Sequence, residues 1–120
     1  MKRIIAILVF VLTVNFQANA QEVKTVSLEQ TKGKFTQQKL TLKEGTYVFE
    51  ISNNNVGHDV GFVLAPKGMV EAAHHIKDAY VTSLVKNNAK STSKKVTLKK
   101  GEYVYFCPLN PTPQYNLTVK

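Results

Sequence analysis

The chain has 120 residues, of which 43% are hydrophobic, and it carries 16 basic against 8 acidic residues. This length allows one domain with one hydrophobic core and leaves no room for a second. Beyond residue 20 every basic residue is a lysine, and the absence of arginine disfavours bidentate recognition of phosphates or base edges. The composition argues against nucleic-acid binding and indicates a lysine-rich surface that attracts acidic proteins or membranes.

The N-terminus has the anatomy of a cleavable signal peptide. A basic pair precedes an apolar stretch from Ile4 to Val14, and Ala18-Asn19-Ala20 provides the small residues of a cleavage site. The apolar stretch is too short for a bilayer span, which needs about 20 helical residues. We therefore expect residues 1–20 to be removed and residues 21–120 to form one exported domain without a membrane span. A bacterial periplasm is the expected compartment, with secretion as the alternative.

A weak internal repeat organises the rest of the chain. Residues 39–49 (KLTLKEGTYVF) return 56 positions later as residues 95–105 (KVTLKKGEYVY). Each copy reads as strand, turn and strand, with Gly45 or Gly101 available for positive φ in the turn. Two copies predict a pseudo-symmetric β-sandwich rather than a solenoid.

Short segments rich in β-branched and aromatic residues, separated by turn signals, predict an all-β Greek-key sandwich. Between its halves, from Met69 to about Val85, apolar residues recur at helical spacing, which predicts one helical excursion around residues 69–85. The predicted strands lie at about 23–28, 35–42, 47–52, 60–64, 94–98, 103–107 and 115–119.

Each copy of the repeat leads to one residue that binds soft or borderline metals. His58 follows the first copy in an asparagine-rich loop, and Cys107 closes the second copy and opens a proline-rich loop over residues 107–115. Cys107 is the only cysteine, so no internal disulfide can form. A thiol at a strand end, on a loop stiffened by prolines, is held in place.

Four stretches of the chain resemble the cupredoxins, the family of blue copper proteins: residues 42–49, 53–62, 99–107, and the closing loop and strand. The resemblance implies that His58 is the first copper ligand and that Cys107 is the thiolate ligand. The family's second histidine commonly lies three residues after the cysteine, where this chain has Asn110. Gln114 falls near the axial position. Because an amide oxygen is a weak donor for copper, we expect Asn110 and Gln114 to be weak or vestigial ligand positions.

The sequence leaves three functions open. The resemblance implies an exported, monomeric copper-binding protein in electron transfer, whose lysines dock an acidic redox partner. The incomplete ligand set also suits a carrier that takes Cu(I) from a copper-donor protein, since Cu(I) accepts two or three soft ligands. A metal-free binding or structural module, with copper lost and Cys107 in the core, explains Asn110 most simply.

An enzyme is not expected. Pro108 removes the backbone N–H next to Cys107 that an oxyanion hole would use, and the acidic residues are scattered singly.

Overall fold

The structure is a computed structural model that describes residues 22–120, so the predicted signal peptide lies outside the described residues. In this part of the chain, no helix has the length and apolar content needed to cross a bilayer.

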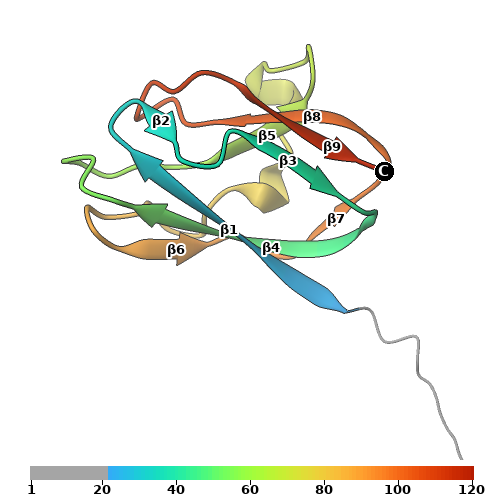
Figure 1. The fold of residues 1–120 in the computed structure, drawn as a ribbon, viewed down its shortest axis with the longest axis horizontal. Coiled ribbons are helices and arrows are strands. Elements are labelled where there is room, and N and C mark those ends of the chain that lie inside the picture. The colour runs from blue at the N-terminus through green and yellow to red at the C-terminus, as the bar shows by residue number, and fades with distance from the viewer. Residues whose placement is uncertain (1–21) are drawn as a thin grey trace, which may run out of the picture.

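The described residues fold into two facing β-sheets (Figure 1). Parallel pairs, β1 with β4 and β3 with β9, combine with antiparallel pairs elsewhere. This arrangement confirms the predicted β-sandwich. The first sheet contains β2 (Lys34–Phe35), β1 (Val23–Thr31), β4 (Gly45–Asn53), β6 (Lys90–Thr92) and β7 (Val96–Leu98), and the second contains β3 (Lys39–Leu42), β9 (Tyr115–Val119), β8 (Gly101–Phe106) and β5 (Val63–Pro66).

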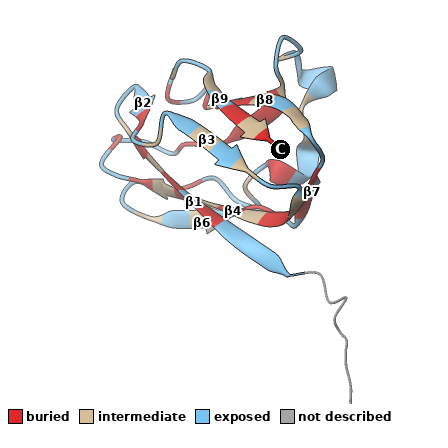
Figure 2. Ribbon diagram, turned by 45° about the vertical axis from the view of Figure 1, so that its right-hand side comes forward, coloured by how far each residue is buried: buried red, intermediate tan, exposed pale blue. Residues whose placement is uncertain are grey.

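The core lies between the sheets, and buried segments occur in both of them (Figure 2). Buried residues alternate with more exposed ones along much of β1, β4, β7 and β9. Its centre is a cluster of aromatic rings. Phe35 packs edge-on against Tyr105 and Phe62, with ring centroids 5.2 and 6.1 Å apart, and Phe62 packs against Phe49 at 5.2 Å. Burial of each such ring stabilises the fold by about 1.5–3 kcal/mol, which compensates for the lack of a disulfide.

The repeat forms two crossings between the sheets. In the first copy the chain leaves β3 in the second sheet and enters β4 in the first; in the second copy it passes from β7 in the first sheet to β8 in the second. The two copies therefore cross in opposite directions, which is the pseudo-symmetry that the repeat predicted.

Each crossing carries the same tyrosine hydrogen bond. The Tyr47 hydroxyl donates to the Lys43 carbonyl at 2.7 Å, and the Tyr103 hydroxyl donates to the Lys99 carbonyl at 2.7 Å, as in the tyrosine corner of other sandwiches. The expectation of positive φ at the repeat glycines is wrong. At either glycine an added Cβ would lie 3.7 Å from the ring of the tyrosine two residues later, so the ring packs against the bare face of the glycine.

The helical excursion around residues 69–85 consists of two single 3₁₀ turns, η2 (Ala72–His74) and η3 (Lys77–Ala79), and not of one continuous helix. Its backbone bonds to the sandwich instead. The Ile76 N–H donates to the Leu64 carbonyl at 2.8 Å, and the Val85 N–H donates to the Val60 carbonyl at 2.8 Å. These tertiary bonds use donors that a helix would need for itself, and they override the helical spacing of the apolar residues.

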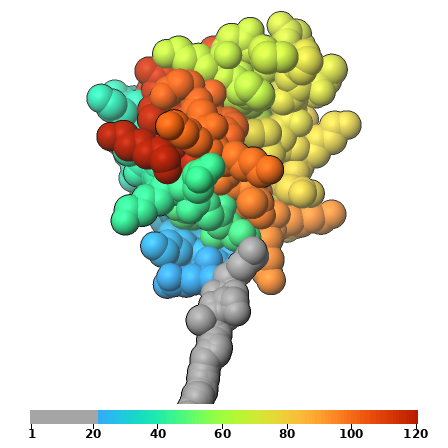
Figure 3. Space-filling model, turned by 90° about the vertical axis from the view of Figure 1, so that its right-hand side faces the viewer, coloured from blue at the N-terminus to red at the C-terminus, as the bar shows by residue number. Residues whose placement is uncertain are grey.

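The sandwich has two ends of different character. Figure 3 faces one of them, where the start of β1, the β3–β4 turn, the β7–β8 turn and the C-terminus gather. Here the Lys100 N–H donates to the Glu44 carboxylate at 2.8 Å, and the Glu44 N–H donates to the Lys120 carbonyl at 3.2 Å. β4 and β8 both run away from this end, so the loops that follow them, with His58 and Cys107, lie at the other.

Tyr105 makes the stability of this core sensitive to alkaline pH. Burial, and to a smaller extent the nearby Tyr115, raise its pKa from 10.0 to about 12, and its hydroxyl donates to the Gln37 carbonyl. The pKa of Tyr105 is higher in the folded state than in the unfolded state. The stabilisation of the fold that results is complete below pH 10 and is lost as the pH rises to 12. Between pH 10 and pH 12 we expect the free energy of unfolding to fall by about 2 kcal/mol less in Tyr105→Phe than in the wild type, as measured by urea denaturation.

Tyr103→Phe serves as the control for that experiment, because it removes a hydroxyl from the same strand at a more exposed position. It should keep the wild-type pH dependence. Identical pH profiles for the wild type and Tyr105→Phe would contradict the assignment.

Candidate metal centre

Cys107 follows β8 and is completely buried. Its sulfur accepts a hydrogen bond from the Gly61 N–H at 3.3 Å. The proline-rich loop folds back on it, because the Cys107 N–H donates to Thr112 Oγ1 at 3.0 Å and the Thr112 N–H donates to the Cys107 carbonyl at 3.3 Å. The thiol is therefore fixed inside the domain, as the loop's prolines suggested, and does not reach the surface.

His58 lies on the loop between β4 and β5 with its ring exposed. Its Nδ1 is 2.9 Å from the Asp59 carbonyl oxygen, and since a carbonyl only accepts, Nδ1 is the donor of this bond, which leaves Nε2 as the nitrogen available to a metal in the neutral ring. Asn53 holds this loop by donating to the His58 carbonyl at 2.8 Å. The residue of the loop that contacts the thiol is instead Gly61, through its N–H.

Asn110 is buried, and both polar atoms of its side chain form hydrogen bonds. Its amide nitrogen donates to the Thr31 carbonyl at 2.8 Å and to Gln30 Oε1 at 3.1 Å. Its side-chain oxygen accepts the Gly33 N–H at 2.7 Å. These bonds pin the turn after β1 to the loop after β8. Gln114, the expected axial position, is exposed just before β9.

Gln30 has a structural role that the sequence did not predict. It is completely buried, and its amide nitrogen donates to the Gly61 carbonyl at 2.7 Å. A signal was present, because Gln30 continues the inward-facing series of Val26 and Leu28 on β1, where a polar side chain needs a partner. Together these contacts form what we call the buried polar chain: Gly33, Asn110, Gln30, Gly61 and Cys107.

A blue-copper centre does not fit the residues as they are placed. Such a centre needs two imidazoles and one thiolate in a plane around the metal. Within residues 22–120 no three His, Cys, Asp or Glu side chains gather closely enough to hold an ion. The Cys107 sulfur faces a backbone N–H, and the Asn110 oxygen already accepts one. Copper ligation by His58 and Cys107 therefore stays a prediction.

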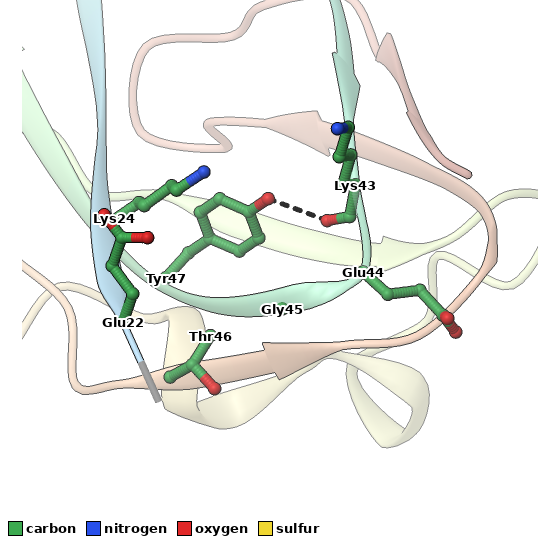
Figure 4. Close-up of a pocket in the computed structure, with 7 residues that line it drawn as sticks. All are labelled: Glu22, Lys24, Lys43, Glu44, Gly45, Thr46 and Tyr47. Carbon is green, nitrogen blue, oxygen red and sulfur yellow. Dashed lines mark hydrogen bonds between the residues drawn. The ribbon is translucent and has the colours of Figure 1, made fainter. Parts of the chain in front are cut away.

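Among the cavities of residues 22–120, one lies beside Cys107 and another at the opposite end of the sandwich. An apolar groove of about 200 Å³ lies beside Cys107. A polar cleft of about 210 Å³ lies at the other end, with the Tyr47 ring at its centre, Lys24 on the β1 side and Lys43 on the β3 side (Figure 4). The lining of this cleft contains neither histidine nor cysteine, so it offers no soft metal ligand. The apolar groove is lined by Gly61, Phe62, Val63, Tyr80, Val81, Leu84, Pro108 and Leu109.

The role of Asn110 can be tested by its removal. Asn110→Ala would leave Gln30 Oε1 buried without this partner and would remove the acceptor of the part-buried Gly33 N–H, and we expect the free energy of unfolding to fall by about 1–3 kcal/mol. Asn116→Ala, the same substitution at an exposed position of β9, should change it by less than about 0.5 kcal/mol. Urea denaturation of both variants measures the difference, and equal losses would mean that the buried polar chain contributes little.

Comparisons with known proteins agree with this fold. Auracyanin B is 20% identical, with a TM-score of 0.65 over 81% of this chain and 88% of that chain. Auracyanin A, a "blue" copper protein from the green thermophilic photosynthetic bacterium Chloroflexus aurantiacus, is 19% identical, with a TM-score of 0.67 over 82% of this chain and all of that chain. An azurin from the methylotroph Methylomonas sp. strain J is 15% identical, with a TM-score of 0.56 over 80% and 97%.

At these identities the similarity shows the fold alone. No match was found among curated proteins. The family model described as "Cupredoxin-like domain" matches residues 4–119, nearly the whole chain, and the chain therefore belongs to the cupredoxin-like family.

Proposed function

We propose that this protein is an exported cupredoxin-like binding module that works without a preformed copper centre. The observation that carries the proposal is the buried polar chain, in which Asn110 and the Cys107 sulfur are already hydrogen-bonded to other parts of the domain. A side chain that closes such a network stabilises the fold, and it is not available to a metal without the loss of those bonds. Cys107 acts here as a small buried hydrophobe.

The proposed compartment is a bacterial periplasm. The basic pair, apolar stretch and small residues of the first 20 positions support export. An unpaired thiol in an oxidising compartment can be oxidised. The free thiol of Cys107 is completely buried, which would protect its sulfur in the periplasm.

Copper-dependent electron transfer is the second candidate. It is favoured by the thiol at the end of β8, in a fold shared with blue copper proteins, and by the free Nε2 of His58. A Cu(I) carrier would use the same two residues. Both functions require the His58 ring to move from the surface to the thiol, which breaks the contacts that Asn53 and Gly61 make in this loop.

A copper titration separates these functions. Residues 21–120, with the thiol reduced, are titrated with Cu(I) and with Cu(II) while the visible thiolate-to-copper band and the thermal midpoint are followed. We expect neither a band nor a rise of the midpoint, because binding to the folded state would have to raise it. We also expect Cys107→Ser to change the unfolding free energy by about 1–2 kcal/mol and nothing else.

Two results would reject the proposal. An intense band that is lost in Cys107→Ser and His58→Ala, but kept in the control His74→Ala, would establish copper-dependent electron transfer. Stabilisation by Cu(I) without colour, with the same dependence on these residues, would establish the carrier.

A further inference from the structure

We propose that the outer edge of β1, from Val23 to Ser27, is a dimerisation site on which a second copy of this domain pairs its own β1 in antiparallel orientation. The inference goes beyond the proposed function and does not depend on whether the domain binds copper. It replaces the monomer that the resemblance implies with a concentration-dependent dimer.

The first half of β1 is paired on one side only. On its inner side β1 pairs with β4 along its length, and on its outer side it meets β2 only at its last two residues. The backbone of Glu29 marks the outer side, because its N–H donates to Gln37 Oε1 at 2.7 Å and its carbonyl accepts the Thr36 N–H at 2.9 Å.

The outward direction of Glu29 fixes the direction of the residues before it. The backbone groups of successive residues in a strand point to opposite sides, so every second residue points the same way. Within residues 22–120, no other backbone segment pairs with these groups on the outer side. The residues that face outward in this open half of β1 are Val23, Thr25 and Ser27.

The excursion over residues 69–85 covers two other sheet edges. The Leu64 carbonyl on β5 accepts the Ile76 N–H at 2.8 Å, and the Thr92 carbonyl on β6 accepts the Thr82 N–H at 2.9 Å. Covered edges cannot pair with another chain.

The edges of β3 and β7 are protected by lysine. The Leu42 carbonyl of β3 accepts the Lys120 N–H next to β9, so the outward positions of β3 are Lys39 and Thr41. β7 has only three residues, and a lysine pair precedes it and another follows it, at 94–95 and 99–100. Short strands and lysines are common protection against pairing between chains.

The open half of β1 has no such protection. Its outward residues Val23, Thr25 and Ser27 are exposed and uncharged, and two of them are β-branched, which favours strand pairing. The one charged residue among them in sequence is Lys24. Its side chain extends toward the ring of Tyr47 on β4, on the side away from the open edge (Figure 4).

The open edge is complementary to itself. When Thr25 faces its own counterpart across a two-fold axis, Val23 of each copy faces Ser27 of the other. All of these are hydrogen-bonded pairs, in which the two residues exchange both of their backbone bonds. The neighbouring registers are worse, since one places Lys24 opposite itself and the other places Val23 opposite the occupied backbone of Glu29.

Net charge opposes this dimer and gives it a distinctive salt dependence. The 14 lysines and 8 acidic residues give residues 21–120 a net charge of +6, so two copies repel each other at long range. Salt screens this repulsion, whereas the backbone bonds of the edge are not charged. The dimer should therefore strengthen with salt, which is the opposite of an attraction between unlike charges.

Sedimentation and hydrogen exchange test the proposal. Residues 21–120 are studied from about 5 to about 500 µM, at about 0.02 M and about 0.5 M salt. We expect a monomer–dimer equilibrium with a dissociation constant at least about threefold lower at high salt. The amides of Thr25 and Ser27 should be protected from exchange only at high protein concentration, whereas the amide of Val26, which faces β4, should be protected at both.

Charge exchange at the two-fold axis locates the interface. Thr25→Lys and Thr25→Glu should each weaken the dimer at least about tenfold, because like charges then face each other directly. An equal mixture of the two variants should restore the dimer. The matched controls Thr92→Lys and Thr92→Glu carry the same charges on the covered edge of β6 and should stay within about twofold of the wild type. Thermal midpoints first confirm that each variant is folded.

Four results would overturn the inference. They are a wild type that is monomeric at every concentration and salt, exchange of the Thr25 and Ser27 amides that does not depend on concentration, equal weakening by the Thr25 and Thr92 variants, and no recovery in the mixture. None of these measurements involves copper, so a failure here is distinguishable from a failure of the proposed function.

Discussion

The hydrogen bonds of Asn110 and Gln30 connect the loops at one end of this sandwich. Asn110, in the loop after β8, holds the turn after β1, and Gln30, on β1, holds the loop between β4 and β5. The two side chains are also bonded to each other at 3.1 Å. Because the side chains of Asn110 and Gln30 are buried, the loss of one leaves the polar group of the other without its partner. The positions of Cys107 and Gly61 depend on this network.

The same network is the basis of the proposal that this chain has no preformed copper centre. A histidine at position 110 would supply the missing ligand type, but it could not donate to Gln30 and Thr31 while accepting from Gly33 as the amide does. A gain of metal affinity would thus compete with the packing of this end. In this chain the side chain of Asn110 has a structural role, because it bonds three other parts of the domain.

Most strands were predictable because their signals are local, but β6 (Lys90–Thr92) was not predicted, and the predicted strands at 35–42 and 60–64 are respectively divided into β2 and β3 and shifted to Val63–Pro66. Alternation along β4 and the repeated strand-turn-strand pattern need no knowledge of distant residues. The two 3₁₀ turns and the role of Asn110 were not predictable in this way, because they depend on partners far along the chain. Asn110 and Gln30 are 80 residues apart. The one signal in the sequence is Gln30, a polar residue in the inward-facing series of β1, because a buried polar side chain needs a hydrogen-bond partner.

Gly61 links the network to the surface. Its backbone closes the buried polar chain, and the absence of a side chain opens the floor of the groove to Leu84 and Leu109.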